Sequence, residues 1–217
     1  MLLINPFITF GKKSEPISGA YDFTTYSNQQ GLPAGDFAPW EYHYTGDPSA
    51  QSSSTHWEVL DGDAWLDGGS NANWQVAGLD TGIGAKPYRM SWRLGTYTGS
   101  SARGGMCLRY LPATANALIV LARPTEGSIQ VRDVINGSES TLASFSYTFA
   151  VGDWLHAEHF PDGSLKVYVN NGTAPVIDIT ADSQFSTDEG LQGITEQYGG
   201  WNSVQVRCRE VAWEELE

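Results

Sequence analysis

The chain has 217 residues, of which 25 are acidic and 12 basic, so its formal net charge is −13. That charge opposes binding to the phosphate backbone of nucleic acids and to anionic lipid. The length fits one large all-β domain or two small ones, and the 24 glycines, 8 tryptophans and 10 tyrosines are typical of a turn-rich, aromatic-rich β protein.

Residues 1–19 are predicted to form an N-terminal arm, in which the apolar run MLLINPFITF precedes the polar stretch GKKSEPISG. The run is broken by Pro6 and its lysines follow it, which is not the pattern of a secretory signal peptide. No segment is long enough to insert into a bilayer as a spanning helix. An exposed apolar arm either packs back on its own domain or docks on a partner. The residues expected to make that contact are Leu2, Leu3, Ile4, Phe7, Ile8 and Phe10.

Residues 20–217 are predicted to form one β domain, because short apolar and aromatic runs alternate with clusters of Gly, Pro, Ser and Asp. No run keeps a helical period, and this spacing predicts an antiparallel sandwich of two sheets. The last strand is expected to return and pair with early ones. Besides the hairpin described next, the expected strands are YDFTT, WEYHYT, HWEVL, AWLDG, YRMSWRLGTY, GMCLRYL, ALIVLAR, SIQVRDVI, TLASFSYTF, PVIDIT and SVQVRCREVAW.

The most specific local prediction is a hairpin over residues 151–170. Two extended runs, 154–160 and 164–170, flank Pro161-Asp162-Gly163. Those three residues suit a three-residue loop, because proline presets φ and glycine takes the left-handed conformation that closes the loop. A loop of this length places Phe160 opposite Ser164 and fixes the register of the whole hairpin.

This register gives the hairpin one apolar face and one polar, aromatic face. The polar face pairs Glu158 with Lys166 and His156 with Tyr168. A two-residue loop would instead bury Glu158 among apolar residues, so the longer loop is preferred. The predicted core face consists of Leu155, Ala157, His159, Leu165, Val167 and Val169.

Two cysteines, Cys107 and Cys208, each lie in an extended pattern. Cys208 shares a face with Val204 and Val206, which favours a buried thiol that acts as a small hydrophobe. A disulfide between the two is the alternative if their strands are neighbours.

Two stretches of the chain resemble the concanavalin A-like lectin/glucanase jelly roll, a group that includes laminin-G-like modules. The first is YDFTTYSNQQGLPAGDFAPWEY with HWEVLDGDAWL, and the second is GDWLHAEHFPDGSLKVYVNNGTAPV. The resemblance covers about residues 20–214. Its motifs are short and mostly structural, so the resemblance implies the fold rather than an activity.

Domains of this type with an apolar arm and no export signal resemble bacteriophage virion proteins, especially tail components and capsid decorations. The resemblance implies a homo-oligomeric structural subunit of the virion, assembled in the host cytoplasm and joined to other virion proteins through the arm. Such a subunit displays a lectin-like domain toward cell-surface glycans. The alternatives are a glycan-cleaving enzyme on the same fold and a free carbohydrate-binding module.

The sequence favours binding over catalysis. Retaining glycoside hydrolases need two carboxyl groups about 5 to 5.5 Å apart, and on this fold they stand at alternate positions of one strand. Glu158 has no acidic residue two positions away, and Asp178 is followed only by Asp182. Asp61 and Asp63 alternate, but in a glycine-containing turn where a solvated loop is expected. The signatures of a serine-nucleophile elbow, a phosphate loop and a dinucleotide site are also missing.

No metal or other cofactor is predicted. His156 and Glu158 face one way along a strand while His159 faces the other, so the three do not converge on a zinc ion. Jelly rolls of the resembled family often bind calcium through loop carboxylates, but no ligand spacing selects a site here. The loop acids considered for calcium are Asp61, Asp63, Asp188 and Glu189.

An aromatic surface for sugars is the remaining prediction. Flat rings cover the apolar faces of pyranoses, while carboxylates and amides bind their hydroxyl groups. The alternative for Trp154 is a packing role in the core, and for the loop aromatics it is closure of the end of the sandwich. The sequons Asn136-Gly137-Ser138 and Asn171-Gly172-Thr173 are interpreted as turns. The predicted carbohydrate-binding residues are Trp154, His156, Glu158, Lys166, Tyr168, Tyr198 and Trp201.

Overall fold

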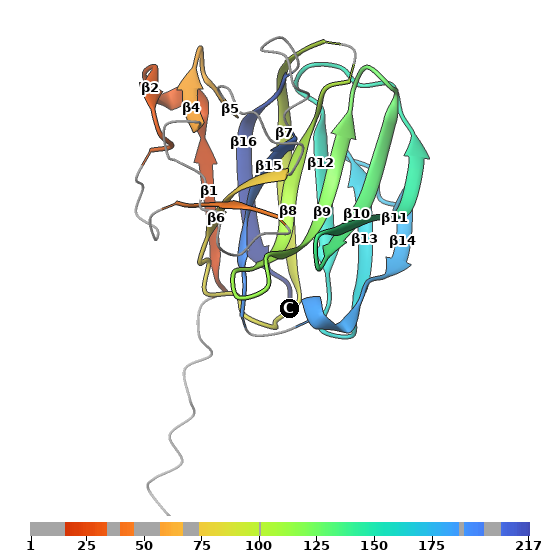
Figure 1. Ribbon diagram of the computed structural model, residues 1–217. Helices are drawn as coiled ribbons and strands as arrows, with labels where there is room; N and C mark the ends of the chain where they lie inside the picture. Colours follow the sequence, from red (N-terminus) through yellow and green to blue (C-terminus); the bar gives the residue numbers. More distant parts are fainter. Residues whose placement is uncertain are drawn as a thin grey trace, which may run out of the picture.

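The computed structural model describes residues 16–33, 40–45, 57–66, 74–99, 101–186, 189–197 and 205–217. Within these ranges the chain forms two antiparallel sheets that face each other as a sandwich (Figure 1). The predicted fold class is therefore confirmed. No helix in the described ranges combines the length and the apolar character needed to cross a membrane.

Sheet A is the nine-stranded sheet and carries the predicted hairpin. Its hydrogen-bonded order is β14 (Ile177–Thr180), β13 (Ser164–Val169), β12 (Trp154–His159), β7 (Tyr88–Thr98), β16 (Gln205–Glu215), β5 (Asp63–Leu66), β4 (Trp57–Leu60) and β2 (Gln29–Gln30), with β1 (Ser18–Asp22) beside β16.

Sheet B is the seven-stranded sheet. Its order is β11 (Ser138–Ser146), β10 (Ser128–Ile135), β9 (Asn116–Arg123), β8 (Arg103–Leu111), β15 (Leu191–Gln197), β6 (Trp74–Leu79) and β3 (Glu41–Tyr44). Two single-turn 3₁₀ helices, η1 (Phe23–Thr25) and η3 (Ser183–Phe185), follow β1 and β14, and each is capped by the aspartate that precedes it.

The last strand organises sheet A. β16 pairs with β7 along one side, and on its other side with β5 and β1, so the end of the chain does return to its beginning as predicted. β1 begins at Ser18, two residues inside the range predicted for the arm. The apolar arm residues lie outside the described part of the chain, and their contacts stay a prediction: Leu2, Leu3, Ile4, Phe7, Ile8 and Phe10.

The hairpin has the loop and the register that the sequence predicted. The Phe160 amide donates to the Ser164 carbonyl at 2.9 Å, and the Gly163 amide donates to the Phe160 carbonyl at 3.0 Å. Gly163 has a φ of 86°, the left-handed conformation that closes the loop. His156 is opposite Tyr168 and Glu158 is opposite Lys166, as the loop length required.

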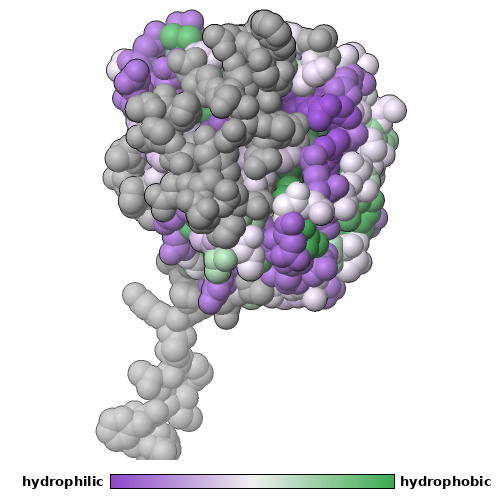
Figure 2. Space-filling model, in the orientation of Figure 1, coloured by the Kyte–Doolittle hydropathy of each residue, from purple (hydrophilic) through white to green (hydrophobic). Residues whose placement is uncertain are grey.

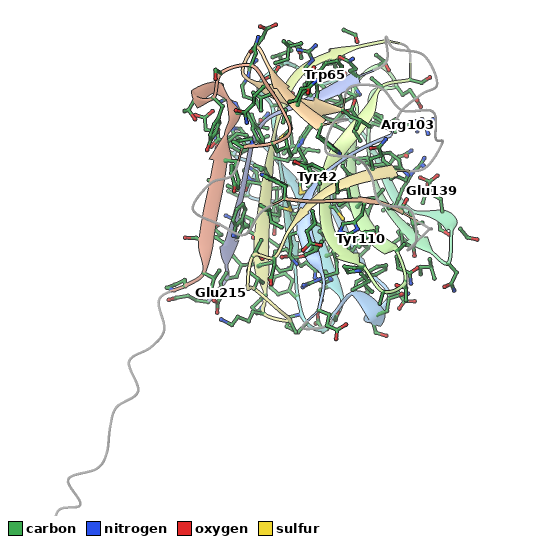
Figure 3. All side chains as sticks on the ribbon, turned by 60° about the vertical axis from the view of Figure 1, so that its left-hand side comes forward. Tyr42, Trp65, Arg103, Tyr110, Glu139 and Glu215 are labelled. Carbon is green, nitrogen blue, oxygen red and sulfur yellow. The ribbon has the colours of Figure 1, made fainter. Side chains whose placement is uncertain are left out.

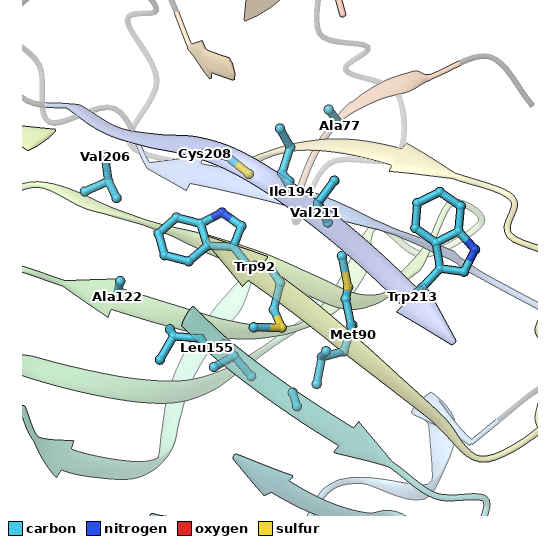
Figure 4. Close-up of a cluster of buried hydrophobic side chains, with 14 of the residues drawn as sticks. Ala77, Met90, Trp92, Ala122, Leu155, Ile194, Val206, Cys208, Val211 and Trp213 are labelled. Carbon is cyan, nitrogen blue, oxygen red and sulfur yellow. The ribbon is translucent and has the colours of Figure 1, made fainter. Parts of the chain in front are cut away.

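The main core fills the space between the sheets. Trp92 and Met90 of β7, Leu155 of β12, Val211 of β16 and Ile194 of β15 meet there (Figure 4). Cys107 and Cys208 are both buried free thiols, so the interpretation as small hydrophobes is confirmed and a disulfide between them is wrong.

A second apolar cluster lies on the other side of sheet B. β9 is buried at every position except its last, so its two faces are both covered. The cluster is bordered by polar contacts at the β11 side, where Figure 3 shows Arg103 and Glu139. Glu139 accepts hydrogen bonds from Trp74 Nε1 at 2.5 Å and from Arg132 Nη1 at 2.6 Å. The apolar members are Trp74, Val76, Cys107, Tyr110, Ala115, Ala117, Ile119, Leu121, Val134 and Leu191.

Candidate functional site

The outer face of sheet A carries the predicted polar side of the hairpin. β12 alternates half-buried and buried residues, with its half-buried side chains turned away from the core. Directly opposed residues of antiparallel strands point to the same side of a sheet. The side chains of this face therefore form three rows that run across the strands rather than along them.

The first row is a ladder of alternating charge. At its centre the Arg89 guanidinium donates to Glu158 Oε1 at 2.5 Å and to Glu214 Oε1 at 3.3 Å. The hydrogen bond to Glu158 raises the pKa of Arg89, and the Glu158 side chain is only 12% exposed. Across the strands the row reads Asp178, Lys166, Glu158, Arg89 and Glu214.

The second row begins with two rings and continues with small residues. The Tyr168 hydroxyl donates to Glu158 Oε2 at 3.0 Å, and Ser91 Oγ lies 2.7 Å from His156 Nδ1. Burial and the nearby Arg89 charge lower the pKa of His156, so its neutral ring is favoured. The row reads Tyr168, His156, Ser91, Ala212 and Ala20.

The third row begins at Trp154, which belongs to this outer face and not to the core. Its ring stacks on His156 with centroids 5.7 Å apart and an interplanar angle of 8°. The Arg93 guanidinium lies 5.7 Å from the same indole and forms an ion pair with Glu210 at 3.7 Å. The alternative of a core role for Trp154 is therefore wrong. The row continues across the sheet to Asp22.

A pocket of about 490 Å³ opens where the first two rows meet the turn after β13. From it, the small side chains of the second row run between two rows of long ones across β7, β16 and β1. Neighbouring strands are about 4.8 Å apart, so the row from β13 to β1 spans roughly 19 Å. The pocket is lined by Arg89, His156, Glu158, Tyr168, Asn170, Asn171, Gly172 and Thr173.

Asn170 connects the segments beside the pocket through its side-chain hydrogen bonds. It was not among the site residues predicted from the sequence. It has a φ of 52°, a left-handed conformation that asparagine tolerates better than most residues. Its Oδ1 accepts from the Trp154 amide at 2.8 Å, and its Nδ2 donates to Asp153 Oδ1 at 3.1 Å and to the Tyr147 hydroxyl at 3.2 Å. Asn170 is thus a positioning residue. The turn predicted at Asn171-Gly172-Thr173 is confirmed and forms the rim.

The other predicted positions have varied outcomes. Lys166 lies on the outer face, with its Nζ 5.8 Å from the Phe160 ring, and does not line the pocket. Tyr198 and Trp201 lie outside the described residues, so the predicted loop site stays a prediction. His159 is 2% exposed on the core side, where burial lowers its pKa to about 4. The prediction that it faces away from His156 is confirmed.

Asp63 corrects the expectation of a solvated loop acid, because it is 1% exposed. Its Oδ1 accepts from Arg209 Nε at 2.9 Å and its Oδ2 from the Thr96 amide at 3.0 Å. It therefore joins β5, β16 and β7 as a structural ion pair. Asp61 and Glu189 are exposed, and Asp188 lies outside the described residues. The described ranges contain no group of three His, Cys, Asp or Glu side chains placed to hold a metal ion.

No family model matches this chain. No curated protein matches it by sequence. Solved structures do match. The carbohydrate-binding module CBM66 from Bacillus subtilis is 12% identical with a TM-score of 0.55, covering 83% of this chain and 98% of the module. The laminarinase from Rhodothermus marinus is 13% identical with a TM-score of 0.57, covering 93% and 99%. The exoplasmic/lumenal domain of VIP36 is 16% identical with a TM-score of 0.51, covering 82% and 83%.

These similarities establish the fold of the chain. It is the concanavalin A-like lectin/glucanase sandwich that the two sequence stretches resembled. Because the identities are between 12% and 16%, they carry no residue of a neighbour's site over to this chain.

Proposed function

We propose that this protein binds carbohydrate without cleaving it, through the pocket on the outer face of sheet A. The carrying observation is a solvent-facing pocket in which rings and a fixed carboxylate converge. Tyr168 and His156 supply ring surface, and Glu158 supplies oxygens that accept hydrogen bonds from sugar hydroxyl groups. The carbohydrate-binding module and the Man3GlcNAc-bound domain of VIP36 have similar folds, and they support this proposal without locating the site.

The charge of the surface favours a neutral glycan over an anionic one. Arg89 and Arg93 are already engaged by acids of the neighbouring strands. The acids of the first and third rows outnumber these two arginines, so a uronate or sulfate group would meet net repulsion. The polar groups that remain for a ligand are hydroxyls, amides and carboxylate lone pairs, which suit a polyhydroxylated chain.

The second row suggests how a bound glycan chain would lie on the outer face of sheet A. Ser91, Ala212 and Ala20 present little bulk between two rows of long side chains, which leaves a shallow path that leads from the pocket across the strands. An extended glycan on this path would place one unit in the pocket and the next units over β7, β16 and β1.

The absence of catalysis is part of the proposal and rests on geometry. The acids nearest to Glu158 on this face stand on other strands, and Glu214 is joined to it only through Arg89. An inverting hydrolase needs open space for the sugar bond and for a water between its two carboxyl groups. Here a guanidinium fills that space. Release of reducing ends from a bound glycan would overturn this part of the proposal and favour the glycan-cleaving alternative.

The direct test is a glycan array followed by titration calorimetry with the best neutral oligosaccharide. Tyr168→Ala and Glu158→Gln should each weaken binding at least about tenfold, which is the effect of one lost hydrogen bond or stacking contact. Lys86→Ala is the matched control, since Lys86 forms an exposed ion pair away from the pocket. Wild-type protein that retains no glycan, or variants that bind as well as wild type, would contradict the proposed site.

We also propose the virion role that the sequence resemblance implied. It rests on the apolar arm, which resembles a docking segment, and on a domain able to display a glycan site. Light scattering of the full chain and of a variant without residues 1–12 tests it. The expected result is that the full chain is a defined oligomer and that the truncated protein is a soluble folded monomer. Two equally stable monomers would contradict the role of the arm in assembly.

A further inference from the structure

We infer that Ser91 and His156 form a nucleophile and base pair that removes small O-acyl groups, such as acetyl, from the bound glycan. Ser91 of β7 and His156 of β12 are directly opposite each other on the outer face of sheet A. The proposed function excludes hydrolysis of glycosidic bonds, whereas this inference concerns an ester on a hydroxyl group of the glycan. It rests on the proposed function for the placement of the glycan, but the reactivity of Ser91 toward a simple ester does not.

The serine hydroxyl and the histidine ring meet beside the pocket. Ser91 Oγ lies 2.7 Å from His156 Nδ1, which is within the reach that a nucleophile and its general base need. His156 lines the pocket, and Ser91 is half-buried next to it. Of the other histidines in the described ranges, His43 pairs with Glu41 and His159 is buried on the core side.

The surroundings of His156 favour a neutral ring that can take a proton from Ser91. Burial is the main cause that lowers the pKa of His156, and the charge of Arg89 adds to it. A hydrogen bond with the backbone of Asn170 acts in the opposite direction, as a carbonyl that accepts from a ring N–H does. A neutral ring carries one N–H, so Nδ1, the nitrogen that faces Ser91, is then an acceptor for the hydroxyl group. Nucleophile, base and orienting acceptor therefore follow one another as they do around an activated serine.

Two arginines flank Ser91 on the same face of β7. Arg89 stands two residues before Ser91 and Arg93 two residues after it, and alternate residues of a strand point to one side. Their ion pairs with Glu158 and Glu210 hold the guanidinium groups in place beside the serine. Positive charge that is fixed in advance stabilises the oxyanion that forms when an ester carbonyl is attacked.

The surface beyond Ser91 suits a small acyl group. The next residues of the row are Ala212 on β16 and Ala20 on β1, whose methyl groups offer apolar contact and leave space above the strands. The large exposed hydrophobic residues of the described ranges lie elsewhere, on β11 and before β12, and hydrophilic or pale residues make up most of the coloured surface in Figure 2. A glycan unit in the pocket can therefore carry its acyl group over Ser91 and Ala212.

The reaction consumes only the ester and water. In the first step Ser91 Oγ attacks the ester carbonyl carbon while His156 Nδ1 takes the hydroxyl proton. The bond between the acyl carbon and the sugar oxygen then breaks, and His156 gives the proton to that oxygen. In the second step water attacks the acyl-serine with the help of the same base, which frees the acid and restores the Ser91 hydroxyl. The acid is an anion, and a chain with a net charge of −13 does not retain it.

The test is the hydrolysis of para-nitrophenyl acetate by the full chain at neutral pH. The expected result is a rate above that of the buffer, with Ser91→Ala and His156→Gln each slower by at least about a hundredfold. Ser164→Ala is the matched control and should keep the rate, because the Ser164 hydroxyl lies on the same sheet but bonds to Asp162. Circular dichroism must give the same fold for all four proteins.

Mass spectrometry of the trapped acyl-serine keeps the test independent of any variant. Trypsin cleaves after Arg89 and Arg93, so residues 90–93 form a peptide in which Ser91 is the only hydroxyl side chain. An acetyl adduct is expected on this peptide after rapid quenching in acid. A rate no higher than that of the buffer, a rate that survives Ser91→Ala, or an adduct on another peptide would each overturn the inference.

A neutral oligosaccharide that carries O-acetyl groups separates this inference from the proposed function. Calorimetry measures its binding, and NMR measures the release of acetate. Binding without release of acetate would overturn the inference and leave the proposed function standing. Hydrolysis of the para-nitrophenyl ester by a protein that binds no glycan would overturn the proposed function and the glycan as substrate, while the reactivity of Ser91 would stand.

Discussion

The outer faces of the two sheets differ in how far their side chains are buried. On sheet A, β12 alternates half-buried and buried positions, and its outward residues form rows of charge and rings. On sheet B, β9 is buried on both faces, and an apolar cluster lies where sheet A has its rows. Strict alternation therefore marks the face that meets solvent, whereas its loss marks a sheet that is covered on both sides.

The largest effect should come from the covered face. Ile119 of β9 is fully buried on the outer side of sheet B. Ile119→Ala should lower the free energy of unfolding by about 2–5 kcal/mol, because it removes buried methyl groups and leaves a cavity. Urea denaturation measures this loss. Glycan affinity of the folded variant should stay unchanged.

A substitution on the outer face of sheet A should have the opposite effect, a small loss of stability and a large loss of glycan affinity. Tyr168→Ala removes a half-buried ring whose hydroxyl bonds to Glu158, so the loss of stability should stay within about 1 kcal/mol, while glycan affinity falls at least about tenfold. If Tyr168→Ala proves as destabilising as Ile119→Ala, the outer face of sheet A is a packing surface, and the comparison between the two faces fails.

Two carboxylates, one on the outer face of sheet A and one buried between the sheets, allow the same comparison for the pH dependence of stability. Glu158 is ion-paired on the outer face of sheet A, whereas Glu196 of β15 is buried between the sheets. Glu196 accepts hydrogen bonds from the amides of Leu66 and Val206, both at 3.0 Å. Burial raises the pKa of Glu196 to about 8, from an ordinary value of about 4.3 in an unfolded chain.

Stability should consequently fall as the pH rises between these two values. In that interval the folded chain keeps a proton that the unfolded chain has released, so the free energy of unfolding declines by up to about 1.4 kcal/mol per pH unit. Below the lower value the contribution of the proton is fully present. Glu196→Gln keeps an oxygen acceptor without a titrating proton and should flatten this slope in urea denaturation series. An equally steep slope in Glu196→Gln would assign the effect to another group, and Glu158→Gln serves as the control.

The sequence predicted most of the fold and about half of the site, for physical reasons. The loop Pro161-Asp162-Gly163 allows one register, and that register placed His156, Glu158 and Tyr168 on one face. Local chemistry was sufficient there. β9 was expected as a strand, yet the burial of both its faces depends on which segments cover it, and no local pattern carries that information.

The parts that were missed come from strands distant in sequence. Arg89 and Ser91 enter the site because β7 pairs with β12, about 65 residues away in the chain. Asp63 was expected in a solvated turn, but pairing of β5 with β16 brings Arg209 to it. Asn170 gave one weak signal, an asparagine at the end of a strand before a turn, which is a position where left-handed φ is common.

A smaller effect on glycan affinity should distinguish a residue that positions the site from one that contacts the glycan. Asn170→Ala removes the acceptor for the Trp154 amide and the donor to Asp153 while leaving every pocket ring in place. We expect a loss of about 1–3 kcal/mol in stability, because a half-buried backbone amide loses its partner and an alanine must take a positive φ. Affinity for glycan should fall less than in Tyr168→Ala. Asn170→Gly, which relieves the backbone strain alone, should recover part of the stability in urea denaturation. No recovery would mean that the side-chain hydrogen bonds account for the whole loss.

The smallest effect should be the pH dependence of binding. Burial and Arg89 lower the pKa of His156, so the ring is neutral at neutral pH and becomes charged only below the ordinary histidine range. Protonation would place a second cation beside Arg89, between Tyr168 and the Trp154 ring. Affinity for a neutral glycan should therefore be constant from pH 8 to about 6.5 and decline below it. Calorimetric titrations across this range measure the decline, and His156→Gln should remove it. A decline that persists in His156→Gln would assign the pH dependence to a group other than His156.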